Sequence, residues 1–220
     1  MPSPTEEELR NLAAQLGCPS GEMGVEVGHK LHEINHPMTL NTFKCLRVKT
    51  GEKLLEIGHG NCSHLPLLLN EVPGFHYTGL EISDTMKTEA ERINAHLLQS
   101  ETASFHYYSG VSIPFEDQSF DHVMTVNTIY FWPSPLKMLN EIKRVTRGSG
   151  KISIGFGQSE YMKQMPVTQF GFNLFNSTMV EELLHDSGFR NLETFDYKEP
   201  VQGYIDAVSD REYVVVTGMA

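Results

Sequence analysis

The most constraining feature of the sequence is a short apolar run that leads directly into two glycines, within residues 53–63. The run at residues 54–57 is too short for a helix and is bounded by turn-forming residues, which is typical of a buried parallel strand. Gly58 and Gly60 then allow the backbone to turn sharply and to pass close to a ligand, where a Cβ atom would clash. The stretch therefore predicts a strand, a ligand-binding turn and a helix start, with Ser63 as the N-cap.

A second apolar segment supports a cofactor site at this turn. Residues 75–80 read as the next strand, and Glu81 follows it, 21 positions after Gly60. A carboxylate at the tip of the second strand, about 20 residues after the glycine turn, is placed to accept hydrogen bonds from both hydroxyls of a ribose. The spacing predicts that the chain binds a cofactor that contains a nucleoside.

Length and composition limit the class of protein. With 220 residues the chain is predicted to form one domain that buries a full core without disulfides. Its three cysteines are widely spaced, which suits a reducing compartment. The sequence does not start with a basic segment followed by an apolar run, and it contains no run of 18 apolar residues. We therefore expect a cytoplasmic protein without a membrane span. The net charge of −11 argues against nucleic acid as a partner, because gripping phosphates requires clustered Lys and Arg.

The first 50 residues predict a helical cap. Thr5 and Glu8 fit a capping box at the start of one helix, and two further helical segments follow, the last at about residues 38–46. Three histidines of the second segment recur at helical spacing: His29, His32 and His36. We interpret them as a polar helix face near a cleft rather than a metal site, because no Cys or carboxylate completes a ligand set.

The remaining chain alternates strands with helices. After Glu81 we expect helices at residues 84–99, 135–145 and 177–187, and strands at 104–108, 122–126, 151–156, 189–198 and 211–217. This alternation is typical of a doubly wound, mostly parallel sheet, here with seven strands in a Rossmann-like α/β arrangement. No helix separates the last two strands, so they should form an antiparallel pair at one edge.

Three of these segments together resemble the successive motifs of class I S-adenosylmethionine-dependent methyltransferases. They are Glu56-Ile57-Gly58-His59-Gly60-Asn61, Leu80-Glu81-Ile82, and the run from Ile113 through Pro114 and Phe115 to Asp121. The similarity covers roughly residues 50–200 and is greatest to the small-molecule and quinone methyltransferases. It implies a helical cap at residues 1–50 and a cofactor-binding domain at 51–220, with a lid segment at about 157–176. It also implies S-adenosylmethionine as cofactor, S-adenosylhomocysteine as product and a small-molecule acceptor.

The resemblance also assigns roles to single positions. Gly58 and Gly60 are expected to lie beside the methionine portion and the ribose of the cofactor. Glu81 is expected to bind the ribose hydroxyls, and Ile82 is expected to pack on the adenine face. The remaining expected cofactor-binding positions are Glu56, Asn61, Cys62, Ser109, Asn127 and Ile129, the last two on the methionine side. Cys62 replaces the third glycine of the family, which is tolerable if its φ is negative. Ser109 replaces the acidic residue that usually reaches the adenine amino group.

Two other functions remain open from the sequence. One is an NAD(P)-dependent oxidoreductase with a related half-sheet, although the dinucleotide fingerprint has a third glycine where Ser63 stands. The other is a non-catalytic regulator that kept the cofactor pocket, because methyl transfer from a sulfonium needs alignment more than dedicated residues. The sequence does not give the acceptor, the methylated atom or the oligomeric state.

The acceptor should lie outside the carboxyl ends of the strands. The aromatic and methionine-rich lid suits an apolar or planar acceptor. Tyr130, His29 and His36 are the predicted catalytic residues, since histidine titrates near neutral pH and a tyrosine can orient a hydroxyl or amine.

Overall fold

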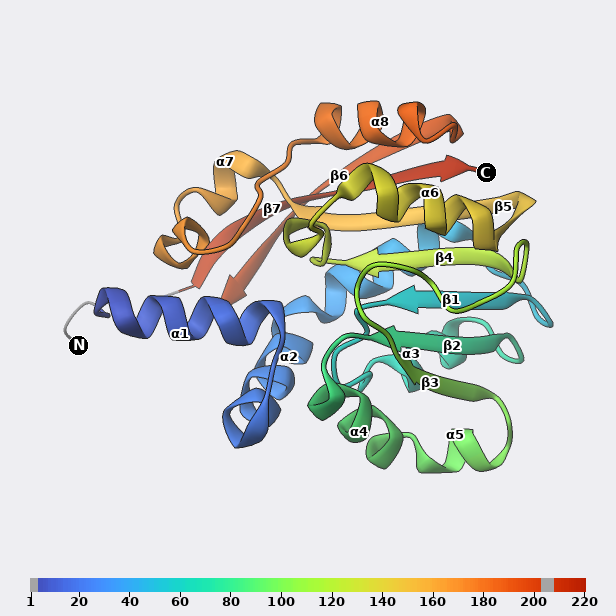
Figure 1. Ribbon diagram of the computed structural model, residues 1–220, viewed down its shortest axis with the longest axis horizontal. Helices are drawn as coiled ribbons and strands as arrows, with labels where there is room; N and C mark the ends of the chain where they lie inside the picture. The colour runs from blue at the N-terminus through green and yellow to red at the C-terminus, as the bar shows by residue number, and fades with distance from the viewer. Residues whose placement is uncertain (1–3, 203–207) are drawn as a thin grey trace.

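Seven strands form a single sheet in the computed structural model, which describes residues 4–202 and 208–220 (Figure 1). Their order is β3-β2-β1-β4-β5-β7-β6, with β1 to β5 parallel and β7 antiparallel to both of its neighbours. The strands are β1 Lys53–Ile57, β2 His76–Glu81, β3 Ala103–Tyr107, β4 Phe120–Val126, β5 Thr146–Gly157, β6 Arg190–Gln202 and β7 Val208–Met219. The predicted Rossmann-like sheet and its antiparallel edge are confirmed.

Helices cover both faces of this sheet. They are α1 Glu6–Gly17, α2 Gly21–Leu46, α3 Leu65–Glu71, α4 Asp84–Ile93, α5 Ala95–Gln99, α6 Pro135–Val145, α7 Ser159–Met162 and α8 Ser177–Asp186. Alternate residues of a strand point to opposite faces, so Leu55 packs beneath α6 and α8, whereas Leu54 packs beneath α2 and α3. The carboxyl ends of the parallel strands point toward α1 and the segment that contains α7 (Figure 1).

Several predicted boundaries were wrong. The second and third predicted helices are one helix, α2, which contains Pro37, because packing along its whole length outweighs the loss of one backbone hydrogen bond. The helix expected at residues 84–99 is interrupted at Asn94. Ser63 does not cap α3, whose N-cap is His64 without a side-chain hydrogen bond. The capping box predicted at Thr5 and Glu8 is confirmed, and Ser83 caps α4.

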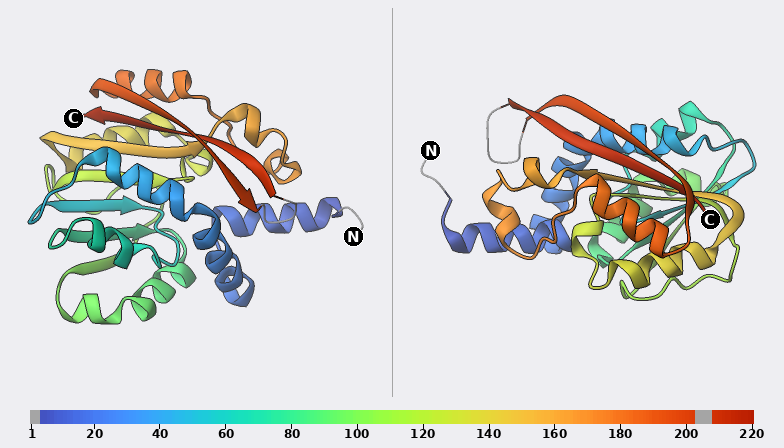
Figure 2. Two further views of the ribbon diagram at one scale, coloured as in Figure 1. Left: turned by 180° about the vertical axis from the view of Figure 1, so that it is seen from behind. Right: turned by 90° about the horizontal axis from the view of Figure 1, so that it is seen from above.

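The N-terminal segment is joined closely to the sheet. The second half of α2 lies across one sheet face, as the rear view in Figure 2 shows. Ser153 of β5 donates a hydrogen bond of 2.9 Å to the backbone oxygen of Thr42. Gly155 lies directly under the same residue, so the helix approaches the strand more closely than a side chain at this position would permit.

This contact predicts a position-specific loss of stability. A Cβ atom added at Gly155 would lie 2.2 Å from Thr42 Oγ1, so Gly155→Ala should lower the free energy of unfolding by about 1–3 kcal/mol in urea titrations. Gly148→Ala in the same strand is the control, because its added Cβ would meet nothing within 4 Å. An equal effect of the two substitutions would contradict the close packing of α2 on β5.

Candidate functional site

The turn after β1 follows a backbone path that glycine favours. Gly58 and Gly60 have φ of +71° and +57°. An added Cβ at Gly58 would lie 2.3 Å from Thr128 Cγ2, so this glycine allows the turn to pack against the loop after β4. A Cβ at Gly60 would meet nothing within 4 Å, and this position lines a cavity. The two glycines therefore serve different purposes, one structural and one that leaves space for a ligand.

The carboxylate of Glu81 connects this turn to the end of β2. One oxygen accepts from the backbone N–H of Gly60 at 3.0 Å, and the other accepts from Ile82 and Ser83 at 2.8 and 3.0 Å. Burial raises the pKa of Glu81 although these donors oppose the shift. Two carboxylate oxygens offer about four acceptor positions, so the three backbone donors leave capacity for a hydroxyl donor from a ligand.

A second polar cluster lies behind the turn. Tyr77 donates to the carboxylate of Glu56 at 2.6 Å, and His64 Nε2 lies 2.8 Å from the same oxygen. Cys62 donates in turn to the Tyr77 hydroxyl at 3.2 Å. Burial favours the neutral imidazole, but Glu56 and Cys62 together outweigh it and raise the pKa of His64 well above its ordinary value. Burial likewise favours a neutral Glu56, but His64 and Tyr77 lower its pKa, so the pair is ionic at neutral pH.

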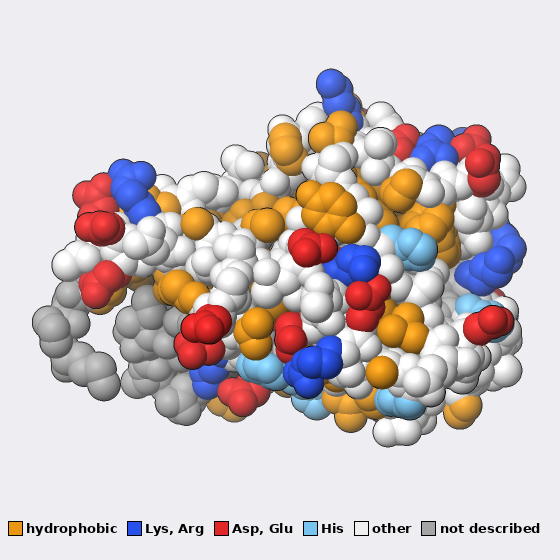
Figure 3. All heavy atoms as spheres, turned by 60° about the horizontal axis from the view of Figure 1, so that its bottom comes forward, with side chains coloured by type: hydrophobic (Ala, Val, Ile, Leu, Met, Phe, Trp, Pro, Cys, Tyr) orange, Lys and Arg blue, Asp and Glu red, His pale blue; other side chains and the backbone are white. Residues whose placement is uncertain are grey.

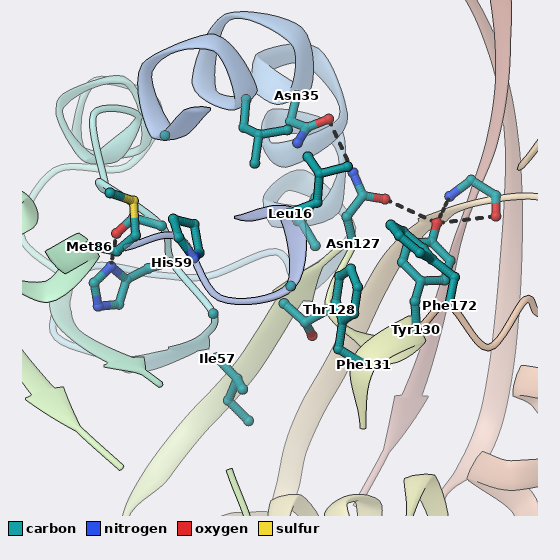
Figure 4. Close-up of a pocket in the computed structure, with 18 of the residues that line it drawn as sticks. Leu16, Asn35, Ile57, His59, Met86, Asn127, Thr128, Tyr130, Phe131 and Phe172 are labelled. Carbon is teal, nitrogen blue, oxygen red and sulfur yellow. Dashed lines mark hydrogen bonds between the residues drawn. The ribbon is translucent and has the colours of Figure 1, made fainter. Parts of the chain in front are cut away.

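The cavity has a volume of about 420 Å³ and extends from the turn to residues 157–176, the segment predicted to be a lid (Figure 4). Its polar half is formed by the strand ends at Gly58, Gly60 and Glu81. Its apolar half is formed by α1, α2, the loop after β4 and the lid, including Leu12, Leu16, Met38, Phe131, Trp132, Met162, Met165, Val167 and Phe172. One cavity therefore joins the predicted cofactor position to an apolar chamber.

Most of the predicted cofactor-binding residues line this cavity. They are Glu56, Gly58, Gly60, Asn61, Glu81, Ile82, Ser109 and Asn127. Cys62 and Ile129 are not among the lining residues and are fully buried in the two cores. The condition set for Cys62, a negative φ, is not met, since its φ is +50°, in the left-handed region that glycine favours. Its thiol points behind the turn because that side offers the hydroxyl of Tyr77.

The histidines of α2 face the cavity differently from the prediction. Ile34 lines the cavity, and the other lining residues of this helix recur at helical spacing: Gly28, Leu31, His32, Asn35, Met38 and Thr39. His29 and His36 fall outside this stripe, and His29 is exposed, so their predicted position facing an acceptor is not observed. His32, which was not predicted as catalytic, lines the cavity. Burial, together with the neighbouring histidines, lowers its pKa to about 4, so it is neutral at pH 7.

Tyr130 lines the cavity, but its hydroxyl is engaged by the protein. It accepts from the backbone N–H of Gly157 at 2.5 Å and lies 3.2 Å from both Gly157 O and Asn127 Oδ1. The side chain is 1% exposed, and burial raises the pKa of Tyr130 well above its ordinary value. A hydroxyl with these partners orients Asn127 and the end of β5, and it is poorly placed to accept a proton from a substrate.

A polar corner that the sequence did not predict connects α2, β4 and β7. Asn35 Oδ1 accepts from Asn127 Nδ2 at 3.1 Å and from Arg211 Nη1 at 2.9 Å. Arg211 is 5% exposed and pairs with Glu199. Because Arg211 follows Asn35 by 176 residues, only the folded chain brings them together. The helical stripe of α2 is the signal that points to Asn35 in the sequence.

The residues of the polar half fit a nucleoside-containing cofactor. The open space at Gly60 admits a ligand against the backbone, and the carboxylate of Glu81 lies beside it. Asn61 Nδ2 is buried and lacks a protein partner among the described residues, so it is a donor available to a ligand. These are the features that the ribose and the amino-acid portion of such a cofactor require.

Other classes of site find less support in residues 4–202 and 208–220. Glu56, Cys62 and His64 are the group there whose potential metal-ligand atoms lie within 4.8 Å of one another, and these atoms already satisfy each other through Tyr77. No helix in that part of the chain is both long and apolar enough to span a bilayer. On the face shown in Figure 3, the described Lys and Arg side chains are scattered among acidic ones.

Comparison with known proteins points to one family. Residues 55–154 match a family described as "Methyltransferase domain". The chain is 24% identical over 197 residues to the O-methyltransferase resE of Aspergillus sclerotiorum. This alignment covers 84% of this chain and 70% of that protein. It is 25% identical over 156 residues to a demethylmenaquinone methyltransferase of Listeria monocytogenes, which covers 67% of this chain and 61% of that protein. The chain therefore spans less than two thirds of the second relative.

Solved structures share the fold over the whole chain. A chain from the complex of the Haloferax volcanii Trm112 methyltransferase activator with a methyltransferase superposes with a TM-score of 0.72. The match covers 99% of each chain at 17% sequence identity. The similarity includes the N-terminal helices and the final strands, which lie outside the matched family segment.

The buried pair of Glu56 and His64 predicts a large effect of one substitution. His64→Ala leaves a buried carboxylate without its cation, so the free energy of unfolding at pH 7 should fall by about 3–5 kcal/mol. His185→Ala on the exposed face of α8 is the control and should change it by less than about 0.5 kcal/mol. Folding raises the pKa of His64, so the protonated imidazole stabilises the folded state below its unfolded-state pKa. This stabilisation is lost as pH rises through the raised pKa of the folded state. Urea titrations that give equal stabilities for both variants would contradict the ionic pair.

Proposed function

Because the chain belongs to the class I S-adenosylmethionine-dependent methyltransferase family, we propose that it methylates a small, largely apolar acceptor held in the lid half of the cavity. The observation that carries this proposal is the single cavity that joins the glycine turn to the apolar chamber. In methyl transfer the donor sulfur, the methyl group and the acceptor atom must lie in line, so donor and acceptor sites must be continuous.

The cofactor half supplies binding and orientation in this proposal. Glu81 accepts a hydrogen bond from a ribose hydroxyl at its remaining acceptor position, while Gly60 leaves space for the ligand beside the backbone. Ile82 and Ser109 line the adenine end, and Asn61 donates its buried amide. Cys62 and Ile129 act indirectly: Cys62 shapes the turn, and Ile129 anchors the loop after β4 in the core.

The lid half contributes by positioning the acceptor and excluding water. The bound cofactor supplies an activated methyl group, so alignment in a dry chamber provides most of the rate. Met162, Val167 and Phe172 of the lid close over the chamber, and the side chains of α1 pack against the same segment. We assign no general base: the Tyr130 hydroxyl is engaged, and His32 has a pKa far below neutral.

Parallel titrations distinguish this function from its alternatives. We expect isothermal titration calorimetry to show micromolar binding of S-adenosylmethionine and S-adenosylhomocysteine and no binding of NADH. Binding of NADH alone would instead support an oxidoreductase. A protein that binds both methionine derivatives, yet transfers no labelled methyl group to the low-molecular-weight fraction of a cell extract, would be a cofactor-binding regulator.

Replacing Glu81 should weaken cofactor binding selectively. Glu81→Ala removes the charged acceptor of a ribose hydroxyl, so the affinity for S-adenosylhomocysteine should fall by about 1.5–3 kcal/mol in calorimetric titrations. Glu116→Ala, at an exposed carboxylate in the loop before β4, is the matched control and should bind S-adenosylhomocysteine with wild-type affinity. Wild-type affinity in a folded Glu81→Ala protein, judged by circular dichroism, would remove Glu81 from the site.

The open space at Gly60 gives a second binding test. Gly60→Val should abolish binding of S-adenosylhomocysteine, because its side chain would occupy the ligand's space. Gly51→Val is the control, since Gly51 also has a positive φ, +82°, and open surroundings but lies outside the cavity lining. Both variants carry comparable backbone strain, so only a ligand at Gly60 makes their affinities differ. Equal affinities would argue against a ligand at Gly60.

A further inference from the structure

The polar corner at the acceptor end has a fixed hydrogen-bond polarity. Arg211 can only donate, so the Asn35 side-chain atom that it contacts at 2.9 Å must be the amide oxygen. Asn127 Nδ2 donates to the same oxygen at 3.1 Å, and Asn127 Oδ1 lies near the Tyr130 hydroxyl. The orientation of the Asn35 amide is therefore set by two independent donors.

This orientation leaves the amide nitrogen of Asn35 free. Figure 4 shows its oxygen turned toward Asn127 and its nitrogen on the other side, near Leu16. Asn35 Nδ2 has no protein hydrogen-bond partner within the part of the chain that the structure describes, and the residue lines the cavity. The apolar chamber is thus provided with an N–H donor that a bound molecule can use.

The charge at this corner is balanced. Glu199 forms an ion pair with Arg211, and the arginine also donates to the backbone oxygen of Ile34 at 2.9 Å. The corner therefore has no net positive charge to attract an anionic ligand. A cationic ligand would find only hydrogen-bond donors there and no acceptor. A neutral oxygen that accepts a hydrogen bond matches both conditions.

We propose that Asn35 selects acceptors with an uncharged carbonyl oxygen on an apolar, ring-sized body, and that Arg211 positions the amide for this contact. The inference rests on the proposed function, because it takes the lid half of the cavity as the acceptor site. The carbonyl oxygen accepts from Asn35 Nδ2, while the apolar body contacts Leu16, Met38 and Phe131. The contact fixes the orientation of the acceptor relative to the cofactor half.

Three naphthalenes of similar size test this selection, and the first two also share a planar side group. They are 2-acetylnaphthalene with a carbonyl oxygen, 2-isopropenylnaphthalene without a polar atom, and 1-(2-naphthyl)ethylamine with a cationic donor. Each is titrated into the protein saturated with S-adenosylhomocysteine, and binding is followed by calorimetry. We expect the ketone to bind about three- to tenfold more tightly than the hydrocarbon, the value of one net hydrogen bond. The amine should bind most weakly.

Two substitutions of Asn35 separate polarity from shape. Asn35→Leu should make the affinities for the ketone and the hydrocarbon equal. Asn35→Asp keeps the oxygen that Arg211 and Asn127 contact and replaces the free N–H donor with an acceptor, so the amine should become the preferred probe. Asn41→Asp is the matched control on the same helix: Asn41 donates to Tyr213 and is not a lining residue, so the ketone should stay preferred.

The outcomes distinguish this inference from the proposed function. A protein that fails to bind S-adenosylhomocysteine overturns the function itself. A protein that binds S-adenosylhomocysteine, but binds the three probes equally or not at all, overturns the role of Asn35. An unchanged order of probe affinities in Asn35→Asp, with S-adenosylhomocysteine affinity retained, overturns it as well.

Discussion

The buried carboxylate of Glu81 holds together the two backbone segments that form the proposed cofactor site. It accepts N–H donors from the glycine turn after β1 and from the chain that leaves β2. Burying a carboxylate is costly unless donors surround it, so this contact requires β1 and β2 to be neighbours and the turn to present its amides inward. The parallel pairing of the two strands meets the first requirement, and the positive φ of Gly60 meets the second.

Polar groups behind the turn complete its support. The pair of Glu56 and His64 connects β1 to the N-cap of α3, and Tyr77 of β2 joins the same carboxylate. Glu56 and His64 also line the cavity, whereas Tyr77 does not, and the space at Gly60 stays open. A rigid turn with one open side costs little reorganisation when a ligand binds, which suits catalysis by alignment.

The acceptor half depends on contacts between distant parts of the chain. A single helix, α2, packs its second half on the sheet and lines the cavity with a stripe that includes His32 and Asn35. Arg211 from β7 and Asn127 after β4 meet Asn35 there, while α1 packs against the lid. The position of the proposed acceptor chamber relative to the proposed cofactor half is thus set by tertiary packing between the helices and the last strands.

The sequence by itself determined the class of fold and most of the cofactor half, because these depend on local patterns. Short apolar runs, the glycines of one turn and an acid at a fixed spacing act within neighbouring strands, and Glu81, Gly58 and Gly60 lie where they were predicted. Tertiary structure decided which face each side chain uses. It turned Cys62 behind the turn and engaged the Tyr130 hydroxyl. It also directed His32 and Asn35, rather than His29 and His36, into the cavity. The physical reason is that a helix or loop is oriented by its packing against segments far away in the chain, as Arg211 is oriented toward Asn35, and no local pattern encodes such a contact.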